Sequence, residues 1–432
     1  MTFHVLPSRP PPPGDSPRLP PPVGDVNSVS SLTIPANVAP DAVSTATAPV
    51  LPGRTLGVLG GGQLGAMFAA AARRMGYRVE AVSDHADCPA ARTCDRVHVD
   101  SLDDPGRLVA IGRSFAAATY EFENIPVAAA RALAAVVPVR PGPEVLFTTQ
   151  DRGREKAFLD RHRFACVSNR MVRSAAEFNA AVAAIGLPAV LKTAASGYDG
   201  KGQVRLGVAA DMEEAWTALG ASMVGTAGLV LEGWIDFDCE ISVVAARGLD
   251  GATAVFEPSL NLHHRHILDL SVAPSGLPAG IVAEARRTAS AILEALGVVG
   301  VACVEFFVTR DGRLLVNEIA PRPHNSGHLT IEACETSQFE QQVRAVCGLP
   351  LGSTRQTSPA AMANILGDCW ERGEPDWAAA LAVPGVSLHL YGKSSPRAGR
   401  KMGHLTAVAA TVDEALAAAR LARSRASRGA VV

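Results

Sequence analysis

The sequence predicts an α/β and α+β protein with a Rossmann-like region first, a region of antiparallel strands next and a small β-rich region last. The chain has 432 residues, which is too many for one compact core and indicates two or three domains. From Arg54 to about Pro143, short apolar strands alternate with alanine-rich helices, and this alternation is typical of βαβ units around a parallel sheet. From Asp151 onward, apolar strands follow one another through glycine-containing loops, which indicates an antiparallel sheet.

The domain boundaries follow from changes in composition and pattern. Residues 1–53 contain thirteen of the thirty prolines and show no hydrophobic period, so they are expected to form a disordered extension. Residues 54–150 then form the Rossmann-like domain, residues 151–350 the middle domain and residues 351–432 the C-terminal domain. The C-terminal domain carries short strands and a final helix that starts near Asp413.

Composition limits the class of partner. The net charge of −2 gives no basic field for nucleic acid or for an anionic membrane, so a small molecule is the expected partner. The eight cysteines include no C-x-x-C pair, which argues against a structural zinc site and fits a reduced compartment. The chain has neither the apolar run of about 20 residues that spans a bilayer nor the basic start of a signal peptide. A cytoplasmic location is therefore predicted.

The first glycine-rich turn is a phosphate-binding candidate. The segment GVLGGGQLG places Gly60, Gly62 and Gly65 between a predicted strand, residues 55–59, and a predicted helix, residues 63–75. This spacing matches the dinucleotide fingerprint, in which backbone N–H groups and the positive end of a helix bind phosphate. The pattern by itself leaves open whether the ligand is NAD or another phosphate compound.

The most informative segment is VACVEFFVTRDGRLLVNEIAPRPHNSGH. Asp311-Gly312 is a strong signal for a two-residue hairpin loop, and counting outward from it places Glu305 opposite Glu318. Such residues have Cβ atoms about 4.5 to 5.5 Å apart, so the two carboxylates would repel unless a cation lies between them. Mg²⁺ or Mn²⁺ would resolve this conflict, with Asn317 as a further oxygen ligand. The alternatives are a register shifted by one residue or two acids on a solvated face.

Four further segments carry charge suited to a nucleotide or a phosphate, and in each case a solvated surface is the alternative. In LPAVLKTAASGYDGKGQ, Lys192 ends an apolar strand before a glycine loop that is not a Walker A loop. VLEGWIDFDCEISV carries Glu232 and Glu240, and TYEFENIP carries Glu121 and Glu123 at a strand end. The loop YGKSSPRAGRKMGH gathers Lys393, Arg397, Arg400, Lys401 and His404.

Taken together, the motifs GGGQLG, TYEFENIP, KTAASGYDGKGQ, LVNEIAPRPHNSGH and GRKMGHL resemble the ATP-grasp superfamily, and within it the N5-carboxyaminoimidazole ribonucleotide synthetase family. They occur in the family's order and cover the chain from about Gly57 to its end. The resemblance implies an ATP-grasp fold with a pre-ATP-grasp domain and a homodimer. It also implies ATP- and bicarbonate-dependent carboxylation of 5-aminoimidazole ribonucleotide through carboxyphosphate, in purine biosynthesis.

The resemblance also implies roles for individual residues. ATP would contact Arg152, Lys192, Gly197, Tyr198, Asp199, Gly200, Lys201, Gly202, Gln203, Glu232, Gly233, Trp234, Ile235, Glu240, His263, Asn317 and Glu318. The metal ion would be held by Glu305, Glu318 and Asn317. The bicarbonate and carboxyphosphate would meet the catalytic residues Tyr198, Lys201, Arg322, His324 and Asn325. The ribonucleotide would contact Gln63, Leu64, Glu123, Lys393 and Arg400.

The sequence departs from the family pattern at several positions. Ala66 and Lys201 stand where arginine is frequent, and the segment before Asn261 is one residue shorter, which makes His264 and His266 alternatives to His263. Three other functions remain open: a formate-dependent glycinamide ribonucleotide transformylase, an NAD-dependent dehydrogenase that uses Asp84 for the ribose, and a nucleotide-binding regulator without turnover.

Overall fold

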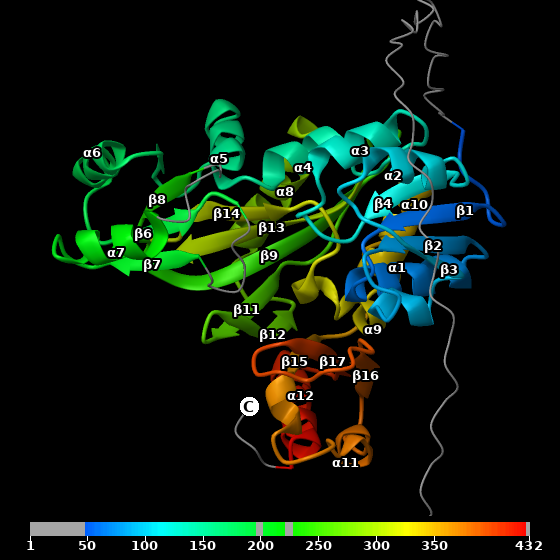
Figure 1. The fold of residues 1–432 in the computed structure, drawn as a ribbon. Coiled ribbons are helices and arrows are strands. Elements are labelled where there is room, and N and C mark those ends of the chain that lie inside the picture. The colour runs from blue at the N-terminus through cyan, green and yellow to red at the C-terminus, as the bar shows by residue number, and fades with distance from the viewer. Residues whose placement is uncertain (1–47, 196–201, 221–227, 429–432) are drawn as a thin grey trace, which may run out of the picture. The chain divides into compact units, whose positions relative to one another are not determined.

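The computed structural model describes residues 48–195, 202–220 and 228–428, and Figure 1 shows their arrangement. The first sheet contains four parallel strands in the order β3-β2-β1-β4, which confirms the predicted Rossmann-like region. Its strands are β1 (Thr55–Leu59), β2 (Arg78–Ser83), β3 (Arg96–Val99) and β4 (Ala117–Tyr120). Its helices are α1 (Gln63–Arg74), η1 (Pro89–Arg92), α2 (Pro105–Gly112), α3 (Val127–Ala134) and α4 (Pro143–Thr149).

Both faces of the central strands of this sheet are covered, which explains why β1 and β4 are buried almost throughout. Leu56 and Val58 pack with α1 and with Phe339 from much later in the chain, whereas Leu59 packs on the opposite face with Leu133 of α3. Alternate residues of one strand therefore enter two separate cores.

Residues 48–53 differ from the expected disordered extension. The backbone N–H of Val50 donates to Cys347 O at 2.7 Å, and Tyr77 donates its hydroxyl to Val50 O at 2.7 Å. Gly53 N donates to Gly76 O at 2.8 Å. The rest of the predicted extension, residues 1–47, lies outside the described residues.

The middle region contains a small antiparallel sheet in the order β5-β8-β6-β7. Its strands are β5 (Asn169–Val172), β6 (Ala189–Thr193), β7 (Gln203–Leu206) and β8 (Leu229–Gly233). Two helices, α6 (Ala175–Ile185) and α7 (Asp211–Gly220), pack on it through Phe178 and Leu219. Another helix, α5 (Arg152–Arg161), begins at Asp151, whose side chain accepts a hydrogen bond from Arg154 N.

The remaining strands form one large antiparallel sheet in the order β14-β13-β9-β11-β12-β15-β17-β16, with β10 paired to β9. The strands are β9 (Phe237–Arg247), β10 (Thr253–Val255), β11 (Ser259–His264), β12 (Ile267–Ala273), β13 (Gly300–Thr309), β14 (Leu314–Ala320), β15 (Ala360–Leu366), β16 (Val386–Leu390) and β17 (Lys401–Val408). The C-terminal strands thus extend the sheet of the middle region, because β15 pairs directly with β12.

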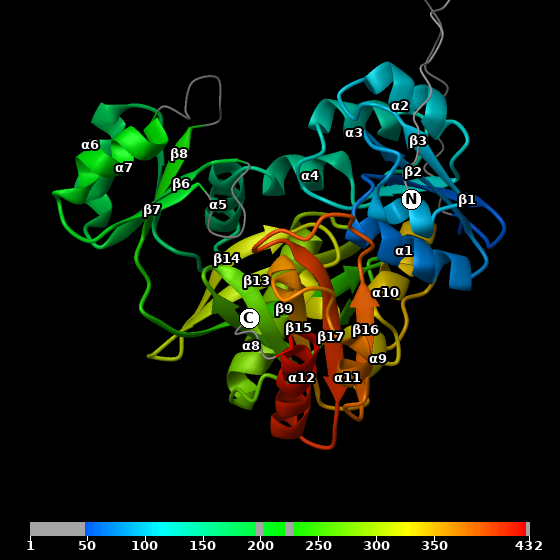
Figure 2. The same cartoon turned by 60° about the horizontal axis from the view of Figure 1, so that its bottom comes forward.

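Helices cover this sheet along its length. α8 (Ala279–Ala295) packs on β9 and β13 through Ala285 and Ile292, and α10 (Gln338–Cys347) packs between β13 and the first sheet. α12 (Val412–Ala426) lies against β15 and β17, as Figure 2 shows. The shorter helical segments are η3 (Asn325–Gly327), α9 (Thr330–Ala333), η4 (Gly367–Trp370) and α11 (Trp377–Leu381). No helix in the described parts of the chain is long and apolar enough to cross a bilayer.

The β13–β14 hairpin pairs Glu305 with Glu318, as predicted, but it reaches that pairing by a different route. The loop has three residues instead of two, because Thr309 N donates to Arg313 O at 2.9 Å. Its last residue, Gly312, has φ +80°, as is typical of three-residue hairpin loops. A bulge between Glu305 and Phe306 then restores the register, because Phe306 pairs with Val316 and Asn317 is the extra residue.

Candidate active site

A cavity of about 670 Å³ opens between the small sheet and the large sheet. Most of the residues predicted to bind ATP, metal or bicarbonate, together with Glu123, line it: Glu123, Arg152, Lys192, Gln203, Glu240, His263, Glu305, Asn317, Glu318, Arg322, His324 and Asn325. These residues come from segments up to about 200 positions apart. The fold therefore brings the predicted nucleotide and metal residues into one space.

The bulge explains why three neighbouring oxygen-bearing side chains face this cavity. In a regular strand, Asn317 and Glu318 would point to opposite faces. The extra residue breaks this alternation, so that Asn317 and Glu318 both line the cavity with Glu305. Among the described residues, no group of three or more His, Cys, Asp or Glu side chains could hold a metal ion. A metal at this hairpin would therefore need ligands from the amide and from the substrate.

The electrostatics of the two hairpin carboxylates fit a bound cation. Burial, together with the negative charges of Glu318 and Glu240, raises the pKa of Glu305 to about 8. Burial likewise raises the pKa of Glu240 to about 7, while the nearby Lys192 opposes the shift. A cation between two carboxylates removes the repulsion between them. Mg²⁺ prefers oxygen ligands such as these carboxylates.

A buried ammonium group connects this hairpin to the small sheet. Lys156 of α5 is completely buried, and its Nζ donates to the backbone oxygen of the bulged Asn317. The same Nζ lies 3.7 Å from Glu232 Oε1 and 3.9 Å from Glu155 Oε1. Burial alone would lower the pKa of Lys156, but the two carboxylates raise it. The ammonium therefore stays charged and links α5, β8 and β14.

Glu232 lies beneath the cavity rather than on its wall. Its carboxylate accepts a hydrogen bond from Lys192 Nζ at 2.5 Å. Burial alone would raise its pKa, but Lys156 and Lys192 hold the pKa at about 2. Glu232 thus orients Lys192, which does line the cavity. The adjacent Gly233, Trp234 and Ile235 are not among the lining residues, and Trp234 is instead exposed beside the guanidinium of Arg205.

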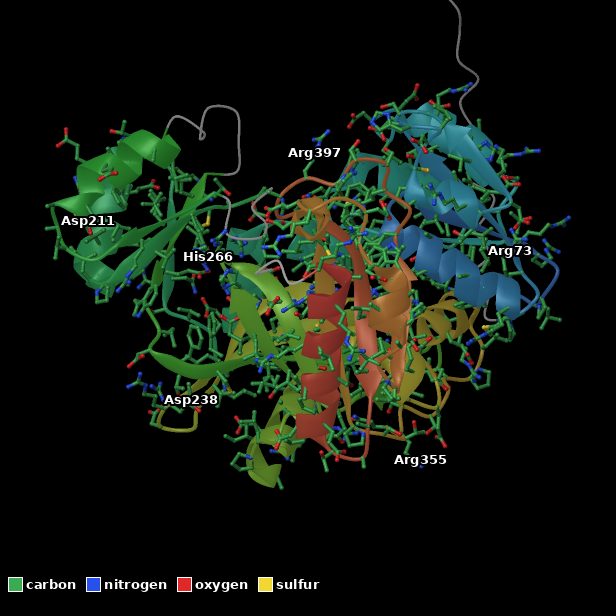
Figure 3. The ribbon with its side chains drawn as sticks, turned by 90° about the horizontal axis from the view of Figure 1, so that it is seen from below. Arg73, Asp211, Asp238, His266, Arg355 and Arg397 are labelled. Carbon is green, nitrogen blue, oxygen red and sulfur yellow. The ribbon has the colours of Figure 1, made fainter. Side chains whose placement is uncertain are left out.

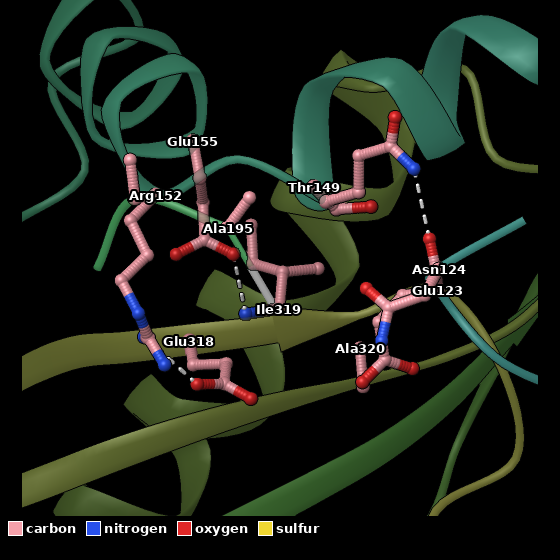
Figure 4. A pocket seen from close by; sticks show the side chains of 11 residues that line it. Glu123, Asn124, Thr149, Arg152, Glu155, Ala195, Glu318, Ile319 and Ala320 are labelled. Atoms are coloured by element: carbon pink, nitrogen blue, oxygen red, sulfur yellow. Dashed lines mark hydrogen bonds and ion pairs between the residues drawn. The ribbon is translucent and has the colours of Figure 1, made fainter. Parts of the chain in front are cut away.

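A smaller pocket of about 40 Å³ adjoins the cavity and shares Glu123, Arg152 and Glu318 with it. Figure 4 shows Arg152 pointing to Glu318, with 3.1 Å between Nη1 and Oε2. It also shows Glu155 accepting a hydrogen bond from Ile319 N at 2.8 Å. The first turn of α5 is therefore fixed to β14 by two contacts, one to the predicted metal ligand Glu318 and one to the next residue, Ile319.

Arg322 and His324 follow β14 and lie on the wall of the cavity. Arg322 forms a bidentate ion pair with Glu123, with 3.0 Å between Nη2 and Oε1. Burial alone would lower the pKa of this guanidinium, but Glu123 raises it. His324 Nε2 lies 3.1 Å from Glu305 Oε1, and burial lowers the pKa of this imidazole well below its usual value.

The glycine turn of the first sheet is arranged differently from a dinucleotide site. The buried Glu121 carboxylate accepts hydrogen bonds from Gly62 N and from Gly65 N, the latter at 2.8 Å. A Cβ added at Gly60 or Gly62 would lie 2.5 Å from the Glu121 side chain. An acidic side chain thus occupies the N–H groups at the start of α1 that would bind a dinucleotide pyrophosphate.

Apart from Glu123, which lines the large cavity, the predicted ribonucleotide residues are not among its lining residues. Gln63 and Leu64 start α1, and Lys393 and Arg400 belong to the loop between β16 and β17. Burial raises the pKa of Glu121, whereas its backbone hydrogen bonds and the positive charges of Arg322 and Lys393 oppose the shift. A Cβ on the neighbouring Gly392 would lie 3.0 Å from Arg92 of η1. The C-terminal loop therefore approaches the glycine turn, whereas Arg400 donates to Ser395 O within its own loop.

Four lining residues were not among the predicted site residues: Arg265, Leu268, Phe307 and Lys401; His266, which also lines the cavity, was an alternative to His263. Arg265 and His266 form the loop of the β11–β12 hairpin with φ values of 49° and 66°, and His266 is labelled in Figure 3. Neither is a glycine or asparagine, so the usual turn signal is missing. Lys401 has a sequence signal, because it belongs to the predicted basic loop, which also contains Arg397 (Figure 3).

The three histidines near the nucleotide residues have different environments. His263 and His266 line the cavity, and His263 Nδ1 lies 3.1 Å from Glu240 Oε2. His264 is exposed and is not among the lining residues. Of the glycine loop, Gly202 and Gln203 are described, and Gly202 O accepts a hydrogen bond from Thr193 N. The predicted residues Gly197, Tyr198, Asp199, Gly200 and Lys201 lie outside the described residues.

Comparisons with known proteins agree with this architecture. Three family models match the chain: a ribonucleotide synthetase preATP-grasp domain at residues 54–150, an ATP-grasp domain at residues 157–339 and a phosphoribosylaminoimidazole carboxylase C-terminal domain at residues 360–418. The N5-carboxyaminoimidazole ribonucleotide synthase of Brucella melitensis biotype 1 is 44% identical over 83% of this chain and 97% of its own.

Solved structures give the same result. A crystal structure of the ADP complex of an N5-carboxyaminoimidazole ribonucleotide synthetase has a TM-score of 0.81 and 38% identity, covering 87% of this chain and 97% of its own. The Aspergillus clavatus synthase in complex with ADP and 5-aminoimidazole ribonucleotide has a TM-score of 0.77 and 28% identity, covering 87% and 99%.

The two sheets, the cavity between them and the matching models define an ATP-grasp ligase that binds ATP. More particularly, the chain belongs to the N5-carboxyaminoimidazole ribonucleotide synthase family. This membership disfavours the NAD-dependent dehydrogenase and the formate-dependent transformylase as functions.

Proposed function

We propose that this protein uses ATP and bicarbonate to carboxylate the exocyclic amine of 5-aminoimidazole ribonucleotide, giving N5-carboxyaminoimidazole ribonucleotide for purine biosynthesis. The observation that carries the proposal is the large cavity. It combines the cations Arg152 and Lys192, which suit phosphates, with the facing carboxylates Glu305 and Glu318, which suit a divalent cation. We further propose the domain boundaries 54–150, 151–350 and 351–432, which the ranges of the three matching models support.

The nucleotide would lie in the cavity between the sheets. Lys192, which Glu232 holds by a hydrogen bond, would contact the phosphates of the nucleotide. Glu240 and His263, which lie beside each other, would form further polar contacts with the nucleotide. Mg²⁺ or Mn²⁺ held by Glu305, Glu318 and Asn317 would neutralise phosphate charge when bound. Gly202, Gln203 and residues 232–235 would complete the nucleotide site, as the family resemblance implies.

The chemistry would proceed in two steps. A bicarbonate oxygen attacks the γ-phosphorus of ATP, and the bond between this phosphorus and the bridging oxygen breaks. The products of this step are carboxyphosphate and ADP. The ribonucleotide amine then attacks the carboxyl carbon and loses a proton, and phosphate leaves. Arg322, held by Glu123, would stabilise the negative charge of carboxyphosphate, and His324 and Asn325 would lie beside it. Tyr198 and Lys201 remain predicted catalytic residues.

The ribonucleotide phosphate would bind where the start of α1 meets the C-terminal loop. Gln63 and Leu64 of α1, with Lys393 and Arg400 of the loop, would form this site. The approach of Lys393 to Glu121 supports this location. The reaction would take place in the cytoplasm, in keeping with eight free cysteines, and the active form would be a homodimer, as the family resemblance implies.

Release of ADP in bicarbonate buffer, with and without 5-aminoimidazole ribonucleotide, tests the proposal. We expect the ribonucleotide to stimulate ADP release and the product to form in equal amount. Formate with glycinamide ribonucleotide serves as the control pair and should give no turnover. Absence of stimulation by aminoimidazole ribonucleotide, or turnover with the control pair, would contradict the proposed reaction.

A further inference from the structure

A buried chain of hydrogen bonds leads from the large sheet to His324. Ser271 Oγ of β12 donates to Asn261 Oδ1 of β11 at 2.9 Å, across a directly opposed pair. Asn261 Nδ2 donates to Ser242 Oγ of β9 at 3.0 Å, and Ser242 Oγ donates to Ser326 Oγ at 2.6 Å. Ser326 Oγ lies 2.8 Å from His324 Nδ1. The serines and the asparagine are all buried.

The chain has a direction, because each hydroxyl supplies one proton. Ser242 accepts from Asn261 Nδ2 and donates its own proton to Ser326. Ser326 in turn has its own proton left for His324 Nδ1. The Cys303 thiol also contacts both serines, but it is only a weak hydrogen-bonding group, and burial keeps it protonated by raising its pKa.

A second contact agrees with this direction but, at 3.4 Å, is too long to hold the tautomer without the Ser326 hydroxyl. His324 is the N-cap of η3, and its Nδ1 accepts a hydrogen bond from Ser326 N at 3.4 Å. If the Asn261 amide were flipped, the chain could run the other way, and Nδ1 would then carry a proton. Such a proton would face the backbone N–H of Ser326, so the reversed chain conflicts with the cap.

The opposite ring nitrogen faces the predicted metal ligand. His324 Nε2 lies 3.1 Å from Glu305 Oε1. We propose that Ser326, supported by Ser242, Asn261 and Ser271, is a positioning residue that holds His324 in the tautomer with its proton on Nε2. The imidazole then donates to Glu305 and keeps that carboxylate oriented, and it is no base toward the cavity. The consequence for turnover rests on the proposed function, whereas the tautomer itself does not.

The tautomer can be observed without substrate or metal by long-range ¹H–¹⁵N correlation spectra of the ¹⁵N-labelled full-length protein. The His324→Gln variant identifies the signals of this ring. We expect the wild-type spectrum to show a protonated Nε2 and an unprotonated Nδ1. We expect Ser326→Ala to shift the ring toward protonated Nδ1 or a mixture, and Ser326→Thr, which keeps a hydroxyl, to restore the wild-type pattern.

Kinetics give the second readout. Outer-shell partners of metal ligands typically contribute roughly 10- to 100-fold to activity or metal affinity, and we expect Ser326→Ala to lower kcat by that order with the KM for ATP unchanged. Ser259→Ala is the matched control, because Ser259 is a buried serine on β11 outside this chain of hydrogen bonds, and it should change neither readout.

A protonated Nδ1 in the wild type, or an unchanged ring spectrum in Ser326→Ala, would overturn the proposal. If Ser326→Ala does not fold, Ser242→Ala serves instead, because it removes the donor that fixes the Ser326 hydroxyl; an unchanged ring spectrum there would be equally contradictory. A wild-type protein that shows the expected tautomer but no carboxylation would refute the proposed function alone.

Discussion

Glu155 is the residue whose titration should be visible in the stability of the protein. Burial raises its pKa from 4.5 to about 7, with Lys156 opposing the shift and Glu318 adding to it. The folded protein therefore binds this proton more tightly than the unfolded chain. Its contribution to the free energy of unfolding is complete below pH 4.5 and is lost as the pH rises through about 7.

We expect Glu155→Gln to flatten this dependence. The amide oxygen can still accept the hydrogen bond from Ile319 N, so the change mainly removes the titrating group. Relative to the wild type, the free energy of unfolding of the variant should rise with pH, by up to about 3 kcal/mol over the whole interval. Urea unfolding between about pH 5 and pH 8 measures it. Glu294→Gln, at an exposed position of α8, should leave the slope unchanged, and an equal slope in both variants would contradict the prediction.

Lys156 should be important for stability, because its ammonium lies among three oxygen groups with no water-exposed surface. Removing one partner of a buried ion pair leaves uncompensated charge and costs about 3 to 5 kcal/mol. We expect Lys156→Met to lower the free energy of unfolding by that amount in denaturant titrations. Arg161→Met, at an exposed position at the end of the same helix, should change it by less than about 0.5 kcal/mol. Equal stability of the two variants would show that Lys156 does not hold the hairpin.

Glu121 shows what sequence reasoning could not reach at the level of one residue. Its position at the end of a strand predicted either a ligand contact or a solvated rim. In the structure, its carboxylate instead accepts hydrogen bonds from the first N–H groups of α1. One of these donors, Gly65, is 56 residues away from Glu121 in the sequence. Nothing local in TYEFENIP specifies that partner, whereas the glycines that make room for it are visible in the sequence.

At the scale of the element, the β13–β14 hairpin was predicted correctly through two deviations that cancel. The Asp311-Gly312 signal located the turn, but a loop of three residues moves the register by one position. The bulge at Asn317 moves it back, so Glu305 still faces Glu318. The carbonyl of the bulged Asn317 accepts a hydrogen bond from the buried ammonium of Lys156 in α5. Residues that far apart give no sign of each other in a local pattern.

The hairpin loop supplies a prediction of its own, at Gly312. No atom lies within 4 Å of a Cβ placed there, so only its backbone, at φ +80°, opposes a side chain. We expect Gly312→Ala to lower the free energy of unfolding by about 1 kcal/mol. Gly280→Ala, in the first turn of α8 and equally free of contacts, should instead be stabilising by roughly 0.5 kcal/mol. Thermal unfolding of both variants distinguishes these cases, and equal effects would contradict a backbone cause.

For the whole molecule, the contiguous motifs were predictable and their assembly was not. The Rossmann-like strands, the hairpin and the final helix, α12, follow from local patterns. The joining of β15 to β12, which extends the sheet of the middle region into the C-terminal one, requires pairing between strands about 90 residues apart. The same assembly places Lys401 on the wall of the large cavity. The sequence of the basic loop predicted only that its cations bind a phosphate, without indicating which ligand carries that phosphate.

The separation of the cavity from the glycine turn predicts that the two ligands stabilise the protein independently. Each ligand should raise the free energy of unfolding by about 2.7 kcal/mol at a concentration 100 times its Kd. Lys192→Met removes a cation of the cavity and should abolish the thermal shift with ATP while keeping that with 5-aminoimidazole ribonucleotide. Lys393→Met removes the cation near α1 and should give the reverse pattern. If either variant lost both shifts while its unliganded melting temperature stayed close to wild type, the two ligands would share one site, and α1 would again be a candidate for binding the nucleotide.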